Sequence, residues 1–443
     1  MLVSSSEPEI KGLSLRANFS WTFIANIIYT GSQWGMLVVL ARIGNPEMVG
    51  QFALGLAIAA PIIILAELNL RAVQATDAQG LYRFGDYLGL RLIMLIFAIT
   101  GITAFALGSY RYETAIVIIA VGVAKGFEST SDVFYGLCQR LERMDRIARS
   151  LILKAVLSLA FLTLGVLLSN RVFWGTVGLV LAWVLVLLTY DVRSGRMLLA
   201  SLEGTSSGAL SPGDWGLLKP HWNPKTLLRL AWLALPLGLV LMLISLSASV
   251  PRYFIERNWG AYELGIFVAI AYLERAGATI ANALGQSASP RMAKYYASGH
   301  RRAYANLLAK LIVVGILIGA SGILVAAVVG KEILALLYGP EYARYTLFIT
   351  IMIAVGINYI ASFLGYAMTA ARYFRVQFPL FTITTALMFV TCALMIPTGG
   401  LQAAANCLVL VAVVRVIGGA CIVFYAIRRG SKPGNDTDAY SHS

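Results

Sequence analysis

Residues 401–427 read LQAAANCLVLVAVVRVIGGACIVFYAI, a long apolar run in which Arg415 is the single charged side chain. An α-helix rises about 1.5 Å per residue, and the hydrocarbon core of a bilayer is about 30 Å thick. About 20 apolar residues are therefore enough to cross it. This stretch predicts a membrane-spanning helix.

Windows of the same kind recur along all 443 residues. The chain is 59% apolar and 13% charged, which leaves too few charges to solvate a water-soluble fold of this size. We predict an all-α integral membrane protein with about 12 transmembrane helices. The twelve windows are residues 21–41, 48–66, 88–107, 114–137, 151–169, 172–190, 227–249, 261–285, 307–329, 346–369, 376–396 and 401–427.

The distribution of Lys and Arg predicts the orientation of these helices. Connections on one side, counted with the adjoining helix turns, hold 25 of these residues, and those on the other side hold 7. Because Lys and Arg are retained in the cytoplasm, both termini are expected there. The net charge of +14 is dispersed over these connections, so no nucleic-acid partner is expected.

Several features of other protein classes are missing from the sequence. The first residues show neither a basic segment nor a clear cleavage site, so no cleaved signal peptide is expected. The four Cys form no CxxC pair, and the three His are scattered. We therefore predict no disulfide framework, no metal site and no cofactor.

A polar connection divides the twelve windows into two sets of six. Residues 196–226 are rich in Gly, Ser and Pro, which favour a loop over a helix. We predict an N-terminal six-helix bundle over 1–195, a cytoplasmic linker over 196–226 and a C-terminal six-helix bundle over 227–428. A disordered cytoplasmic tail is expected over 429–443.

The second and eighth windows begin alike. Each has a Gly-x-Phe element shortly after an acidic residue, with Gly50 and Gly265 lying 215 positions apart. The match suggests a parallel duplication, an arrangement in which a substrate path runs between two bundles.

Three cations lie near the middle of predicted helices: Lys125, Arg275 and Arg415. A charge at the centre of a membrane helix costs about 2.5 to 3.5 kcal/mol, so such residues usually face a cavity or a partner. We predict that they line a watery cavity between the two bundles. The alternative for Lys125 is a structural pair with Glu128 that only locks two helices together.

Polar side chains recur every three or four residues in three windows, and so share one face of each helix. They are Asn18, Thr22, Asn26, Tyr29 and Gln33 in the first window, Lys125, Glu128, Ser129 and Asp132 in the fourth, and Arg275, Thr279, Asn282 and Gln286 in the eighth, with Glu274 beside them. Such faces should meet protein or water rather than lipid.

The chemistry of these side chains suggests a cargo. Arg offers several donors to phosphate, so cations in both halves suit an anionic substrate. The predicted substrate-binding residues are Lys125, Arg275, Arg415, Asn26 and Asn282. The acids Glu128, Asp132 and Glu274 are predicted to bind H⁺ or Na⁺ for coupling. For the amides of the first window, helix-to-helix contact is an equal alternative.

Other function classes are disfavoured. We find no nucleophile elbow, phosphate-binding glycine loop or HExxH pair, so no enzymatic activity is expected. A channel would need a re-entrant or interrupted helix, and none is evident in the sequence. A transporter is the class that remains.

Three sequence elements resemble a known family. They are Asn18-Phe19-Ser20-Trp21, the stretch LARIGNPEMVGQFA over residues 40–53, and LYGPEYA over residues 337–343, which is similar to an LYGxxY element. They resemble bacterial polysaccharide-transport proteins, the Wzx-like O-antigen and exopolysaccharide flippases of the MATE/MOP superfamily. The resemblance implies a multi-pass protein of the bacterial inner membrane. It also implies export of an undecaprenyl-pyrophosphate-linked oligosaccharide by alternating access, alongside membrane lipids, a polysaccharide polymerase and chain-length proteins as partners.

Two competing functions stay open. An ion-coupled multidrug or metabolite antiporter of the MATE-like branch would use Glu128 and Asp132 to bind cations. An integral glycan polymerase or ligase would need a long outer loop to hold its acceptor, and the longest candidate, near residues 328–346, is short.

Overall fold

The computed structural model describes residues 13–77, 80–202, 212–371 and 373–429, and every regular element among them is a helix. The chain forms two compact units, Met1–Ala269 and Ile270–Ser443. The first holds α1 (Leu15–Ile43), α2 (Pro46–Glu67), α3 (Leu70–Thr76), α4 (Phe84–Ser109), α5 (Tyr112–Arg140), α6 (Met144–Ser169), α7 (Val172–Val186), the π-helix η1 (Leu187–Asp191), α8 (Val192–Leu202), the 3-10 helix η2 (Pro212–Leu218) and most of α9 (Pro224–Ala271). The second holds α10 (Glu274–Ala297), α11 (Arg301–Leu337), the 3-10 helix η3 (Pro340–Tyr342), α12 (Tyr345–Ala370) and α13 (Phe374–Arg429).

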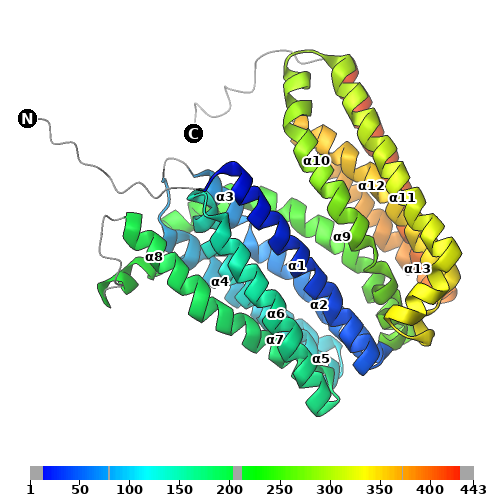
Figure 1. Cartoon of the computed structure of the whole chain (residues 1–443), viewed down its shortest axis with the longest axis horizontal. Coiled ribbons are helices and arrows are strands. Elements are labelled where there is room, and N and C mark those ends of the chain that lie inside the picture. The colour runs from blue at the N-terminus through cyan, green and yellow to red at the C-terminus, as the bar shows by residue number, and fades with distance from the viewer. Residues whose placement is uncertain (1–12, 78–79, 203–211, 372, 430–443) are drawn as a thin grey trace, which may run out of the picture. The chain divides into compact units, whose positions relative to one another are not determined.

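In the first unit, α5 is the central helix. It packs against α2, α4 and α7, while α6 lies between α1 and α7 (Figure 1). The buried core at one end of α5 includes Tyr87 of α4, Phe134 of α5, Leu187 of η1 and Leu230 of α9. Polar residues on α5 are thus enclosed by neighbouring helices.

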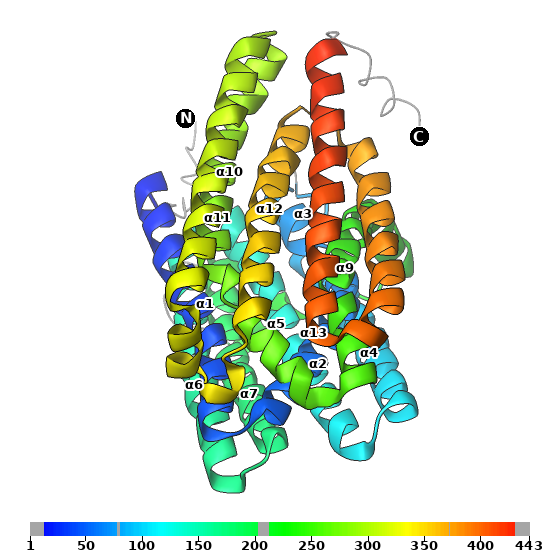
Figure 2. The same cartoon turned by 90° about the vertical axis from the view of Figure 1, so that its right-hand side faces the viewer.

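In the second unit, α12 is the central helix and packs against α10, α11 and α13. Within α13 the chain turns back on itself at Gly400, which has φ 58° (Figure 2). The two arms lie close together, since a Cβ placed on Gly418 would lie 2.6 Å from Leu380 Cδ1. Glycine suits this turn because other residues rarely adopt a positive φ.

The described residues contain ten helices long and apolar enough to span a membrane. The count falls below twelve partly because α13 holds the predicted windows 376–396 and 401–427, and α9 holds 227–249 with the start of 261–285. The predicted number of twelve spans, the cytoplasmic termini and the division at 196–226 stay predictions. Most of the predicted tail, and residues 203–211 of the predicted linker, lie outside the described residues.

The expectation that no predicted helix is interrupted is wrong for the window 261–285. Helix α9 ends at Ala271 and α10 begins at Glu274. At this break the backbone N–H groups of Leu273 and Arg275 bond to carbonyls three residues earlier, instead of four. Neither Gly nor Pro lies at this point in the chain, so no residue signals the break in advance.

The two glycines of the predicted repeat lie at a close crossing of α2 and α9. A Cβ on Gly50 would lie 1.8 Å from the carbonyl oxygen of Ala261, and one on Gly265 would lie 1.8 Å from that of Pro46. No side chain fits at either position, so both glycines allow the two backbones to touch. The duplication itself stays a prediction.

Candidate functional site

The predicted site residues fall in both units. Lys125, Glu128, Asp132 and Asn26 belong to the first unit, and Glu274, Arg275, Asn282 and Arg415 belong to the second.

Lys125 and Glu128 form an ion pair on α5. Lys125 Nζ lies 2.6 Å from Glu128 Oε2 and 5.2 Å from the centre of the Trp183 ring. The hydroxyl of Tyr29, on α1, donates to the other carboxylate oxygen. The alternative reading of Lys125, a pair with Glu128, therefore describes its geometry. Both side chains are about one-quarter exposed, so the pair remains within reach of water.

Asp132 is paired with two arginines from other helices. Arg71 Nη1 of α3 lies 3.1 Å from Asp132 Oδ1, and Arg91 Nη2 of α4 lies 3.9 Å from Oδ2. Arg91 is fully buried and also donates to Ser129 Oγ at 2.8 Å. The carboxylate of Asp132 is thus held by guanidinium groups. Sequence reasoning counted both arginines only as orientation signals, although Arg91 lies inside the window 88–107.

A further ion pair, which the sequence analysis missed, is buried nearby. Lys154 of α6 and Asp191 of η1 are 3.4 Å apart, with exposed side-chain fractions of 0% and 2%. Lys154 Nζ donates to the hydroxyl of Tyr135 at 2.9 Å, and that hydroxyl lies 2.7 Å from Ser150 Oγ. Both charged residues sit at the edges of predicted windows, where sequence alone favours an exposed position.

Asn26 is exposed on α1, and the structure shows no hydrogen bond from its side chain to another described residue. Its neighbour on the same face, Tyr29, points to Glu128. We call Lys125, Glu128 and Asp132, together with the nearby pair of Lys154 and Asp191, the α5 cluster. The polar face of α1 approaches this cluster through Tyr29 and leaves Asn26 exposed.

In the second unit, the Arg415 guanidinium has few polar neighbours. Its Nη1 donates to Asn358 Oδ1 of α12 at 3.0 Å, and the guanidinium lies 5.6 Å from the centre of the Phe381 ring. Its Nε is buried with no hydrogen-bond partner in the described part of the chain. No carboxylate of these residues lies within 4 Å of it. A buried donor without an acceptor is costly, so this group is able to take an anionic ligand.

Arg275 and Asn282 lie on the exposed face of α10. The Arg275 guanidinium lies 5.5 Å from the centre of the Tyr272 ring and forms no ion pair with a described carboxylate. Tyr366 of α12 donates to Asn282 Oδ1 at 3.5 Å, and Tyr359 donates to the backbone carbonyl of Glu274 at 3.0 Å. Thus α12, which the sequence analysis did not single out, supplies contacts to Asn282, to the backbone of Glu274 and to Arg415, but none to Arg275. The one amide of α12, Asn358, was the signal in the sequence that could have pointed to it.

Two cavities of the molecule differ in whether residues of the predicted polar faces line them. One of about 440 Å³ in the second unit is lined by polar and aromatic side chains that include Gln286, Ser289, Tyr366 and Thr369. Gln286 belongs to the same α10 face as Arg275 and Asn282. This cavity therefore extends the predicted polar face toward the C-terminal end of α10.

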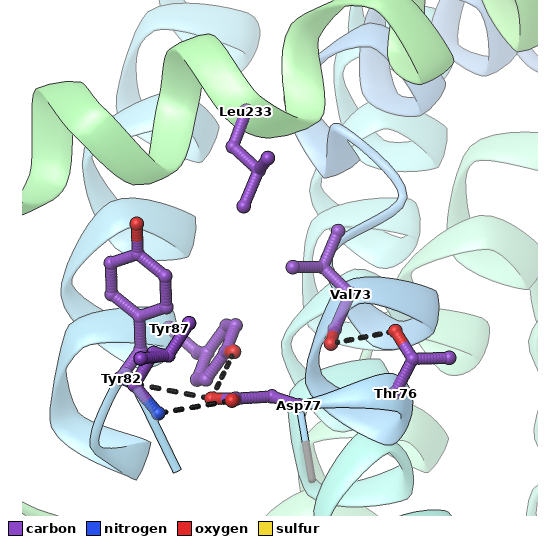
Figure 3. Close-up of a pocket in the computed structure, with 7 residues that line it drawn as sticks. Val73, Thr76, Asp77, Tyr82, Tyr87 and Leu233 are labelled. Carbon is purple, nitrogen blue, oxygen red and sulfur yellow. Dashed lines mark hydrogen bonds between the residues drawn. The ribbon is translucent and has the colours of Figure 1, made fainter. Parts of the chain in front are cut away.

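A cavity of about 370 Å³ in the first unit contains none of the predicted site residues. Its walls include Thr76, Asp77, Tyr87 and Leu233 (Figure 3). The Asp77 carboxylate accepts from the Tyr87 hydroxyl at 3.2 Å and from two backbone N–H groups. The Asp77 side chain therefore stabilises the backbone at Leu81 and Tyr82. No group of three or more metal-ligating side chains occurs within the described ranges.

These observations define the class of protein, which is a helical, multi-pass membrane protein with polar and charged clusters among its spans. Residues 15–296 match the family described as "Polysaccharide biosynthesis protein", which is more than half of the chain. The chain therefore belongs to the polysaccharide biosynthesis protein family, and the predicted family is confirmed.

Among individual relatives, the chain is 28% identical over 396 residues to "Capsular polysaccharide biosynthesis protein CapF" of Staphylococcus aureus, covering 88% of this chain and 94% of that protein. Its fold is similar to "Lipid II flippase MurJ, inward closed conformation", with a TM-score of 0.67, 10% identity and coverage of 93% and 87%. It is also similar to a MATE-family multidrug resistance transporter of the MOP superfamily in its inward-facing conformation, with a TM-score of 0.58, 13% identity and coverage of 96% and 98%. The likeness to these solved structures establishes the fold.

Proposed function

We propose that this protein is a flippase that moves an undecaprenyl-pyrophosphate-linked oligosaccharide across the bacterial inner membrane by alternating access. The product would supply O-antigen, capsule or exopolysaccharide assembly, where a polysaccharide polymerase and chain-length proteins would use it. Its membership of a polysaccharide biosynthesis family and its similarity to CapF support this role. MurJ, which has a similar fold, is a lipid II flippase, and this supports a lipid-linked cargo.

The observation that carries the proposal is the Arg415 guanidinium. A cation among membrane helices costs about 2.5 to 3.5 kcal/mol unless it is compensated, and no carboxylate compensates this one among the described residues. A pyrophosphate would supply oxygen acceptors in the planar geometry that a guanidinium favours. We assign Arg415 and Arg275 to the phosphates.

The remaining residues receive roles that follow from their side chains. Asn26 and Asn282 are exposed amides, and we assign them to hydroxyl groups of the oligosaccharide. Lys125 would bind phosphate when its pair with Glu128 opens. We propose Glu128, Asp132 and Glu274 as the groups that exchange H⁺ or Na⁺ during the cycle, with twelve spans and two six-helix bundles as the moving framework.

Reconstitution tests the proposal directly. Purified protein in vesicles should accelerate the appearance of a labelled undecaprenyl-pyrophosphate oligosaccharide on the opposite leaflet, measured by accessibility to an added glycosidase. Protein-free vesicles and vesicles with a denatured sample give the background rate. A rate equal to that background would reject the proposal.

The antiporter alternative makes a different prediction. If the protein exports soluble cations, vesicles with an imposed H⁺ or Na⁺ gradient should accumulate a fluorescent cationic drug. In cells, deletion should then raise drug sensitivity and leave surface polysaccharide normal. Loss of surface polysaccharide without altered drug sensitivity would favour the flippase.

A further inference from the structure

One end of the second unit carries a concentration of exposed positive charge. We call it the basic surface, and it consists of Arg291, Lys294, Arg301, Arg302, Lys310 and Arg428. All six side chains are exposed, and no Asp or Glu occurs in the sequence from residue 276 to residue 331. The five members on α10 and α11 thus have no acidic neighbour along the chain.

Contacts within the second unit fix these residues at a common end. The turn between α10 and α11 is held where α12 and α13 end: Tyr304 donates to the carbonyl of Ala367 at 2.9 Å, and Tyr296 donates to that of Ala426 at 3.4 Å. Arg301 Nη1 also donates to the carbonyl of Arg428 at 3.2 Å. The ends of α10, α11 and α13 therefore present their basic residues together, and the end of α12 lies beside them.

The length of α11 places this end at the boundary of the membrane. Its 37 residues measure about 55 Å at 1.5 Å per residue, well above the roughly 30 Å of hydrocarbon. The apolar run of α11 starts after Lys310, so the preceding turns project from the hydrocarbon. Tyrosine rings accompany them, with Tyr425 exposed and Tyr296 half-buried, and aromatic residues of this kind favour the headgroup region.

Another basic turn in the protein has an acidic partner of its own. Between α5 and α6, the Arg143 guanidinium binds both oxygens of Asp145 at 2.9 and 3.0 Å. By contrast, no member of the basic surface forms an ion pair with a described carboxylate. Membrane orientation accounts for the sign of these charges, but their lack of acidic partners leaves the guanidinium and ammonium groups open to anions.

We propose that the basic surface binds the phosphate headgroups of anionic membrane phospholipids. Clustered Lys and Arg beside a spanning helix attract such headgroups electrostatically. The neighbouring tyrosines provide rings that pack at the same depth. Lipid bound there would hold the ends of α10, α11 and α13 together at the membrane surface, independently of the transported substrate.

The test removes charge at positions whose side chains form no hydrogen bond or ion pair with the described residues. The variant is Lys294→Gln/Arg302→Gln/Lys310→Gln in the full-length protein. The matched control, Lys219→Gln/Lys225→Gln/Arg229→Gln, removes three exposed charges from the first unit. Binding of short-chain phosphatidylglycerol to protein in a neutral detergent is measured at low and high salt, with phosphatidylcholine as the uncharged comparison.

The proposal expects at least tenfold weaker phosphatidylglycerol binding for the first variant, little change for the control and loss of the difference at high salt. Equal affinity in all three proteins would overturn it. So would a case in which only undecaprenyl pyrophosphate binding weakens, because the surface would then serve the substrate. Unfolding temperature and elution volume establish that each variant is folded.

Discussion

The α5 cluster of the first unit and the Arg415 region of the second differ in whether the charges in their membrane spans have oppositely charged partners. In the first, Lys125, Asp132 and Lys154 each lie within 4 Å of an opposite charge. In the second, the Arg415 guanidinium has an amide oxygen and an aromatic ring, and no carboxylate among the described residues. Paired charges stabilise a particular helix arrangement, whereas an uncompensated one favours an anionic ligand.

The largest effect should follow from breaking the buried pair of the first unit. Lys154→Met leaves the Asp191 carboxylate buried without its cation, and such a change costs about 3 to 5 kcal/mol of unfolding free energy. Titration with a denaturing detergent, followed by circular dichroism, measures the loss.

The double variant Lys154→Met/Asp191→Leu is the control for that experiment. It removes both charges, so most of the lost stability should return. If the single and double variants are equally unstable, packing around Lys154 matters more than charge pairing, and the contrast between the two regions weakens.

Arg415→Gln should separate stability from activity. We expect a decrease of about 10- to 100-fold in the rate of oligosaccharide-lipid flipping, because charge-assisted hydrogen bonds contribute about 1.5 to 3 kcal/mol each. The unfolding temperature should stay constant or rise, since the change removes an uncompensated charge. The glycosidase-accessibility assay and thermal unfolding in detergent measure the two quantities.

Arg171→Gln is the matched control, because Arg171 is exposed between α6 and α7. It should leave both quantities unchanged. A loss of stability in Arg415→Gln without a specific loss of flipping would assign Arg415 a structural role like that of Lys154.

A smaller effect is expected at the partly exposed pair of the first unit. Removing both charges in Lys125→Gln/Glu128→Gln should change the unfolding free energy by about 1 kcal/mol or less, because water screens side chains that are one-quarter exposed. The same detergent titration applies. A loss as large as that of Lys154→Met would place this pair among the buried structural charges.

Sequence periodicity predicted the helices well because membrane spans are defined by length and apolarity alone. The turn at Gly400 lies between the predicted windows 376–396 and 401–427, where the short connection required a tight turn. The break near Leu273 could not be predicted, because it depends on local backbone geometry that no Gly or Pro marks.

The site was predicted in part. The i, i+3, i+4 spacing placed Lys125 beside Glu128 correctly, because helix geometry fixes neighbours within one helix. Partners from other helices were missed: Arg71 and Arg91 for Asp132, and Asn358 for Arg415. Such contacts depend on how helices pack, which a single sequence does not encode in any local pattern.

The smallest expected effect concerns Asp77, an acid outside the spans that is held by hydrogen bonds. Partial burial acts to raise the pKa of its carboxyl, but hydrogen bonds from the Leu81 and Tyr82 backbones and from the Tyr87 hydroxyl outweigh burial, and the pKa lies below its ordinary value. A carboxyl whose pKa is lowered on folding stabilises the protein above the unfolded pKa of about 3.9, and loses that contribution as the pH falls toward the folded value.

Asp77→Asn should therefore lower the unfolding temperature modestly at pH 7, and the difference from the wild type should shrink progressively below about pH 5. Thermal unfolding in detergent between pH 7 and pH 3 measures it. Glu113→Gln, at an exposed acid in the first turn of α5, is the comparison and should show a smaller pH-dependent difference. A difference for Asp77→Asn that persists unchanged at pH 3 would mean that the shape of the side chain, rather than its charge, holds the loop, so that charge stabilises the first unit only through its ion pairs.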